Sequence, residues 1–272
     1  PMQADRVSVV HNAIGDVPWR SDLQADAPQL VMVARMAAPK RPDVLIAALA
    51  LLACVVALLG SKETFSRMVD QWARWHRLCM RFLLGQTVRL EGEIPAGPVF
   101  VAIKHESFFE AIDLARLLHR PGVFAKAELM RIPLWGLVGR RYGLVEVQRE
   151  QGAKALRHMM AAAKKISGEG RPLVIFPEGT RQLPDTPADI KPGVIFMYNE
   201  LGIPCVPVAL NTGLCWQGSG FLRKPGHVVF EVLPPIEPGL KRAEFTQRLK
   251  DALDPATQKL VAEGRAAQGG RS

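Results

Sequence analysis

From position 87 to the C-terminus, short apolar runs alternate with longer segments of helical periodicity, and this alternation limits the possible folds more than any other feature. Seven runs are candidate strands: 87–90, 99–103, 123–125, 144–147, 173–176, 206–210 and 228–232. Helical patterns fall at 108–118, 134–141, 152–166, 194–201 and 243–253. Strands that alternate with helices predict an α/β fold with a mixed, mainly parallel sheet covered by helices.

The N-terminal third has a different pattern. Residues 1–40 mix Asp, Gln, Pro and Arg without sustained periodicity, and we expect a loose lead-in there. Residues 44–60 form an uncharged block of 17 residues. As a helix this block would reach about 25 Å, just short of the ~30 Å hydrocarbon core of a bilayer. Polar positions are missing on every face, which favours membrane insertion, as a span or as a hairpin in one leaflet, over burial in a protein core.

The segment 63–84 predicts a basic amphipathic helix. Its arginines lie apart from large side chains at three-and-four spacing: Phe65, Met68, Val69, Trp72, Trp75, Cys79 and Phe82. Such a helix suits a membrane interface, and packing on the domain is the alternative. Three regions are therefore predicted, with a lead-in at 1–40, membrane-anchoring helices at 41–86 and a catalytic domain at 87–272. Basic residues flank the apolar block equally on both sides, so charge does not orient it.

Composition and net charge limit the kinds of partner that this chain can bind. The formal net charge of +9, from 35 Lys and Arg against 26 Asp and Glu, predicts an anionic partner such as nucleic acid, a phosphorylated small molecule or acidic lipid. Nucleic acid is disfavoured, because aromatic residues make up only 7% and no RNP, zinc-finger or basic-zipper pattern is present. The four cysteines show no CxxC spacing, which favours reduced, packed thiols, with a Cys205–Cys215 bridge as the less favoured alternative.

The segment KHESFFEAID follows the second predicted strand and places Glu110 five residues after His105. Five residues of helix rotate by about 140°, so the two side chains can meet only if His105 precedes the helix. Ser107 is then a suitable N-cap. Ser107 and Glu110 also match the S-x-x-E capping box, which gives Glu110 a purely structural alternative role. Asp113 is a reserve partner for the histidine.

A second motif, FPEGTR, follows the strand at 173–176. HESFFE followed by FPEGTR resembles the glycerolipid acyltransferases, most of all the bacterial 1-acyl-sn-glycerol-3-phosphate acyltransferases. Further blocks keep the family's order: KAEL, IPLWG and VQR lie between the two motifs, and KPG and VPVA follow. The resemblance covers residues 98 to about 235, and FPEGTR is its most specific part. The chain departs from the family's commonest pattern at two positions, with Lys104 in place of Asn and Glu110 in place of Asp.

The resemblance implies transfer of a fatty acyl group from acyl-CoA or acyl carrier protein to the free hydroxyl of 1-acyl-sn-glycerol-3-phosphate, which forms phosphatidate. The expected location is the cytoplasmic membrane, with the catalytic domain facing the cytoplasm and membrane lipids as partners. No metal and no cofactor besides the acyl donor are expected. The alternatives are another lyso-lipid acceptor or a non-catalytic lipid-binding protein.

The chemistry of acyl transfer to an alcohol predicts roles for residues in and around the two motifs. A neutral imidazole can take the proton of an attacking alcohol, so His105 is the predicted general base, with Glu110 as the carboxylate that fixes its tautomer. Phosphate recognition calls for cations and close main-chain approach. Predicted substrate-binding residues are Lys126, Arg149, Glu178, Gly179, Thr180, Arg181 and Lys191. For Glu178 both loop ordering and binding of the glycerol hydroxyl remain open, and each cation has solvated surface charge as its alternative.

Overall fold

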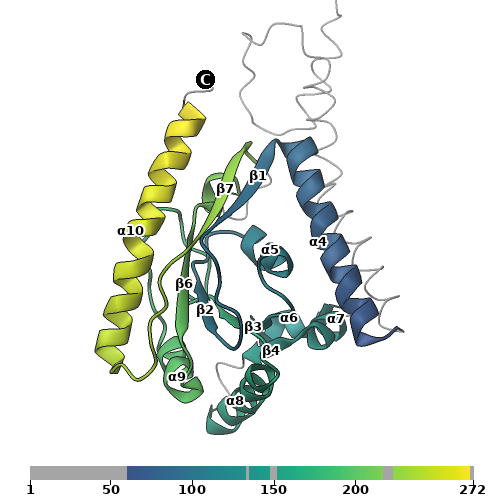
Figure 1. Cartoon of the computed structure of the whole chain (residues 1–272), viewed down its shortest axis with the longest axis vertical. Coiled ribbons are helices and arrows are strands. Elements are labelled where there is room, and N and C mark those ends of the chain that lie inside the picture. The colour runs from purple at the N-terminus through teal and green to yellow at the C-terminus, as the bar shows by residue number, and fades with distance from the viewer. Residues whose placement is uncertain (1–59, 133–134, 148–151, 217–222, 270–272) are drawn as a thin grey trace, which may run out of the picture. The chain divides into compact units, whose positions relative to one another are not determined.

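The computed structural model describes residues 60–132, 135–147, 152–216 and 223–269 (Figure 1). The predicted lead-in at 1–40, nearly all of the apolar block at 44–60 and Arg149 lie outside the described residues. Within the described ranges, no helix combines the length and the apolar character needed to cross a membrane.

The strands that the structure describes form one sheet with the order β1-β7-β6-β2-β5-β3-β4. Their bounds are β1 Gln86–Glu91, β2 Phe100–Ile103, β3 Gly122–Lys126, β4 Leu144–Val147, β5 Leu173–Ile175, β6 Cys205–Leu210 and β7 Gly226–Val232. Neighbouring strands run parallel except β6 and β7, which are antiparallel. The prediction of a mixed, mainly parallel sheet is confirmed, and each predicted strand matches an observed one within two residues at either end.

The described helices are α4 Lys62–Leu84, α5 Phe109–Leu117, α6 Ala127–Met130, α7 Trp135–Tyr142, α8 Gly152–Gly168, α9 Pro192–Leu201 and α10 Arg242–Gly269, with a 3-10 turn η1 at Thr212–Leu214. Helix α10 is longer than predicted. It continues through Pro255, and beyond the proline Thr257, Leu260 and Val261 keep a buried face. Helix α6 was not predicted, because a single turn carries too little periodicity to detect.

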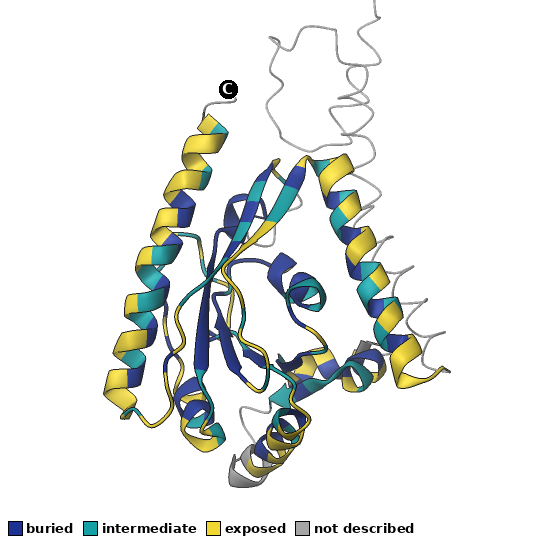
Figure 2. Ribbon diagram, viewed as in Figure 1, coloured by how far each residue is buried: buried dark blue, intermediate teal, exposed yellow. Residues whose placement is uncertain are grey.

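The central strand β2 is buried on both faces (Figure 2). Its side chains alternate between two core layers, as a strand requires. Phe100 and Ala102 belong to the layer that contains residues of α8, α9 and α10. Val101 and Ile103 belong to the opposite layer, which contains Phe109 of α5. The residues that follow β2 therefore emerge from the middle of the sheet.

Helix α4 packs on the domain through one face, formed by Phe65, Val69, Ala73, His76 and Met80. The sequence had placed Trp75 and Phe82 on the same apolar stripe as Phe65. They instead lie on a second apolar face, where they are 46% and 76% exposed. The two interpretations of this helix are thus separated by face: one face packs on the domain, and another presents apolar side chains to solvent.

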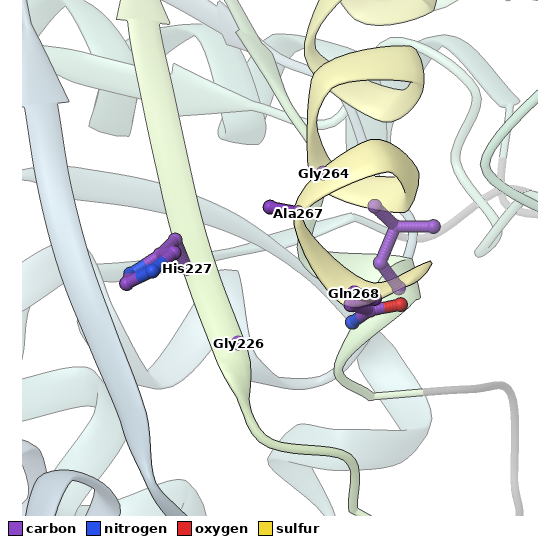
Figure 3. A pocket seen from close by; sticks show the side chains of 6 residues that line it. Gly226, His227, Gly264, Ala267 and Gln268 are labelled. Carbon is purple, nitrogen blue, oxygen red and sulfur yellow. The ribbon is translucent and has the colours of Figure 1, made fainter. Parts of the chain in front are cut away.

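A small cavity lies between the start of β7 and the C-terminal end of α10 (Figure 3). Its lining residues are Leu214, Gly226, His227, Gly264, Ala267 and Gln268. At about 20 Å³ it has room for a single water molecule but not for a lipid or a thioester. It is a packing gap.

Candidate active site

The candidate site lies where the carboxyl ends of three adjacent strands meet, the usual position for ligands in open α/β sheets. Strand β2 pairs with β5 on one side and with β6 on the other. The segment after β2 begins with Lys104 and His105, the segment after β5 is FPEGTR, and the segment after β6 is 211–213. The Gln182 N–H donates to the carbonyl of His105 at 2.7 Å, so the two motifs are also joined through the backbone.

The structure brings His105 and Glu110 together. Nδ1 of His105 lies 2.9 Å from Oε1 of Glu110. The histidine precedes α5, which begins at Phe109, and this placement allows the two side chains to meet. The Glu110 side chain is fully buried, whereas the imidazole is 17% exposed. The ring of Phe176, from FPEGTR, stacks on the imidazole with 4.2 Å between ring centres. The histidine is therefore held on two sides but still open to solvent.

The carboxylate of Glu110 accepts from several donors besides the imidazole. Oε1 accepts from the N–H groups of Glu106 and Ser107 at 2.7 and 2.6 Å, and Oε2 accepts from the hydroxyls of Ser107 and Thr212 at 2.5 and 2.8 Å. So many donors suit an ionised carboxylate, which can only accept. Nδ1 of His105 then carries the proton, and Nε2 is left as the basic nitrogen.

The two roles considered for Glu110 are both present. Its contact with the Ser107 N–H is similar to the return contact of a capping box, and the same oxygen faces His105. Ser107 is not the N-cap itself, because the cap position is Phe108, one residue later than predicted. The Ser107 hydroxyl nevertheless accepts from the Phe109 N–H at 3.1 Å.

Asp113, the reserve partner for the histidine, is engaged elsewhere. Its carboxylate receives a two-pronged contact from Arg77 of α4, at 2.8 and 2.6 Å. The contact fixes α4 to α5, the helix that carries Glu110. Asp113 therefore joins α5 to α4 through Arg77 and does not pair with His105.

Lys104 and Glu178 form a fully buried ion pair beside the dyad. Nζ of Lys104 lies 3.3 Å from Oε1 of Glu178 and donates to the Thr186 carbonyl at 2.8 Å. Burial raises the pKa of the Glu178 carboxyl, and the charge of Lys104 opposes that rise. Of the two roles predicted for Glu178, this geometry favours loop ordering. Sequence reasoning noted Lys104 only as a departure from the pattern and did not assign it to the site.

Glu106 is a buried carboxyl that sequence reasoning missed. Its Oε2 accepts from the Gly213 N–H at 2.9 Å, and its Oε1 has no hydrogen-bond partner within the described ranges. Burial raises the pKa of Glu106 to about 8. The charges of Glu110 and Glu178 add to the rise, whereas the Gly213 N–H and Lys104 oppose it. At neutral pH the Glu106 side chain therefore carries a proton.

Most of these site residues lie in a stretch of the chain that is similar to known proteins. A family model described as Acyltransferase matches residues 86–211. Over this stretch, which is just under half of the chain, the sequence is similar to that family. One relative is the 1-acyl-sn-glycerol-3-phosphate acyltransferase of Pseudomonas aeruginosa, 24% identical over 184 residues that cover 67% of this chain and 72% of that protein. Another of the same name, from Helicobacter pylori, is 32% identical over 121 residues, which are 43% of this chain and half of that protein.

The acyltransferase fold also occurs in a solved structure. The crystal structure of the 1-acyl-sn-glycerophosphate acyltransferase PlsC from Thermotoga maritima is similar with a TM-score of 0.61 and 18% sequence identity. The similarity covers 85% of this chain and 93% of the Thermotoga chain. At this identity the comparison establishes the fold.

The remaining predicted binding residues of the acyltransferase are more exposed than the dyad. Gly179 has a φ of 64°, the left-handed conformation that glycine adopts without strain. Thr180 and Arg181 follow it and are exposed, and Thr180 accepts from the side-chain amide of Gln182 at 3.2 Å. Lys126 is exposed at the carboxyl end of β3. Lys191 is exposed and paired with Asp189. Within the described ranges, no cluster of side chains is suited to hold a metal ion.

Proposed function

We propose that this acyltransferase moves a fatty acyl group from acyl-CoA or acyl carrier protein to the free hydroxyl of 1-acyl-sn-glycerol-3-phosphate and so forms phosphatidate. The observation that carries the proposal is the pairing of a partly exposed His105 with a buried Glu110 at the edge where FPEGTR also lies. The curated relatives from bacteria carry this activity in their names, which supports the choice of acceptor.

In the proposed reaction, Nε2 of His105 takes the proton of the acceptor hydroxyl as its oxygen attacks the thioester carbonyl. The new ester C–O bond forms, the C–S bond breaks, and the proton passes from the imidazolium to the departing thiolate. Glu110 stabilises the imidazolium that develops and keeps the ring in the productive tautomer. The attacking oxygen belongs to the acceptor, so transfer is direct and no acyl-enzyme forms.

The acceptor phosphate is assigned to the exposed cations of the same edge. Arg181 offers a planar fork to phosphate oxygens. Lys126 ends β3, which pairs with β5 and runs in the same direction, so its charge lies on the same edge of the sheet. Gly179 permits close approach of the main chain to the ligand.

The acyltransferase is proposed to act at the cytoplasmic membrane with its catalytic domain facing the cytoplasm. Exposed Trp75, Leu78 and Phe82 form one face of α4, and exposed Arg74 and Arg81 lie beside them. Aromatic rings and arginines in this arrangement suit the headgroup region of a lipid surface.

The test is an assay of the purified full-length protein in detergent with labelled acyl-CoA or acyl carrier protein and a panel of lyso-lipid acceptors, with products identified by mass. We expect phosphatidate as the main product and no transfer by His105→Ala, whose thermal unfolding should match that of the wild type. Preference for a different lyso-lipid would change the acceptor, and absence of any product with either donor would overturn the proposal in favour of a lipid-binding role.

A further inference from the structure

The segment that follows β6 approaches the catalytic loop at two atoms. The Thr212 hydroxyl donates to Oε2 of Glu110 at 2.8 Å, and the Gly213 N–H donates to Oε2 of Glu106 at 2.9 Å. Thr212 and both carboxylate side chains are buried. Thr212 and Glu110 are 102 positions apart in the sequence.

This segment is itself held firmly from the side away from the dyad. The side-chain amide of Asn211 donates to the carbonyls of His227 and Leu260, both at 3.3 Å. Its Oδ1 accepts from the Val229 N–H at 2.9 Å. Asn211 thereby ties the segment to β7 and α10. Thr212 is a donor in a fixed position, because its neighbour is anchored to two other elements.

The close approach also depends on Gly213. A Cβ atom at this position would lie 2.7 Å from Cγ of Pro184 and 3.1 Å from Oε2 of Glu106. The first distance is shorter than real Cβ contacts allow, and Pro184 has little freedom to move away. A glycine directly after Thr212 therefore lets the segment reach the catalytic loop.

We propose that Thr212 is a positioning residue, which fixes the Glu110 carboxylate so that Oε1 stays on Nδ1 of His105. Within the described ranges, Oε2 of Glu110 has two donors, the hydroxyls of Ser107 and Thr212. Ser107 lies three residues before Glu110 in the same stretch of chain, directly ahead of α5, and moves with it. Thr212 comes from a separate segment that is anchored to β7 and α10, so its hydroxyl holds the Glu110 carboxylate in a fixed position relative to the sheet. The proposal rests on the proposed role of His105 and Glu110.

The test compares four variants of the full-length protein in detergent. Thr212→Val keeps the shape and removes the hydroxyl, while Thr212→Ser and Thr212→Ala form a second pair that differs only in the hydroxyl. Thr257→Val is the matched control, because Thr257 is also a buried threonine and its hydroxyl has no partner within the described ranges.

We expect Thr212→Val to lower kcat by about tenfold or more with the acceptor KM within about twofold, which is the signature of an interaction needed in the transition state. Thr212→Ser should retain most of the activity, whereas Thr212→Ala should lose it. Thr257→Val should match the wild type in kcat and in acceptor KM.

Two results would overturn the assignment: a Thr212→Val variant with the kcat of the wild type, or equal losses of kcat in the serine and alanine variants. If Thr212→Val does not fold, the serine and alanine pair still decides the role of the hydroxyl. His105→Ala is measured in parallel. If it retains activity, the proposed dyad fails; if it is inactive, the Thr212 variants report on Thr212 alone.

Discussion

Glu106 provides a quantitative test of the electrostatics at the candidate site. Its carboxyl has a raised pKa, about 8 instead of 4.5, chiefly because it is buried. Between these values the folded protein holds a proton that the unfolded chain has lost. The contribution of Glu106 to the unfolding free energy must therefore fall as pH rises from 4.5 to 8. Glu106→Gln removes the titration and keeps an oxygen that can accept from the Gly213 N–H.

The size of the effect follows from the two pKa values. At pH 5 the penalty for Glu106 is under about 1 kcal/mol, and at pH 7 it is about 3 kcal/mol. Between pH 5 and pH 7 the wild type should thus lose roughly 2 to 3 kcal/mol relative to Glu106→Gln. This difference does not depend on the cost of burying the glutamine amide, because that cost is the same at both pH values.

The assay is urea unfolding of full-length protein in detergent, followed by tryptophan fluorescence at several pH values from 5 to 8. Glu169→Gln is the control: Glu169 lies at the surface, and its contact with Arg171 lowers the pKa of its carboxyl, so it stays ionised throughout this range. Its pH dependence should follow that of the wild type. Parallel curves for the wild type and Glu106→Gln would refute the reasoning.

Three further predictions follow from the site and its support. His76 is buried among aromatic rings, and burial lowers its pKa to about 4, so the contribution of His76 to the unfolding free energy falls as pH falls below 6.5. Urea unfolding at pH 5 and pH 7 measures this contribution. His76→Phe should lose about 2 kcal/mol less unfolding free energy than the wild type on going from pH 7 to pH 5. Equal losses in the two proteins would contradict the assignment. Lys104→Met should cost about 3 to 5 kcal/mol of unfolding free energy, because it leaves Glu178 buried without its counter-ion. The double variant Lys104→Met with Glu178→Gln should regain much of the lost unfolding free energy. If the losses of the two single variants instead add up in the double variant, the two side chains are not coupled. Arg181→Ala should raise the acceptor KM about tenfold with little change in kcat, and an unchanged KM in steady-state kinetics would place the phosphate elsewhere.

The strands were predictable because each contains a short run of apolar or β-branched residues, and β2 is apolar on both faces. Helix α4 was predicted as a helix but its faces were not resolved. Periodicity gave one broad apolar stripe, whereas the structure divides it into a packed face with Phe65 and an exposed face with Trp75 and Phe82. Which part of a stripe is covered depends on the neighbouring elements, and these are set by tertiary packing.

The site could be predicted only where the chain supplies a motif. HESFFE and FPEGTR gave His105 and Glu110, but the local pattern could not decide between a capping and a catalytic role for the glutamate. The structure shows one carboxylate making both sets of contacts. Thr212 and Glu106 were missed, since a threonine after a strand and a glutamate after a histidine carry no pattern that sets them apart. Their contacts exist only because β6 lies beside β2.

The two departures from the common pattern flank His105, and each is matched by a contact from later in the chain. Lys104 places a buried positive charge in the core, where its ammonium group pairs with Glu178 and donates to the Thr186 carbonyl. Glu110 is one methylene longer than the usual aspartate and has one more rotatable bond, so its carboxylate needs donors on both oxygens to hold a single orientation. Ser107 and Thr212 supply them on the oxygen that faces away from the imidazole. In the proposed dyad, Glu110 can take the place of the aspartate because Thr212, in the segment after β6, restricts the rotation that the extra bond allows.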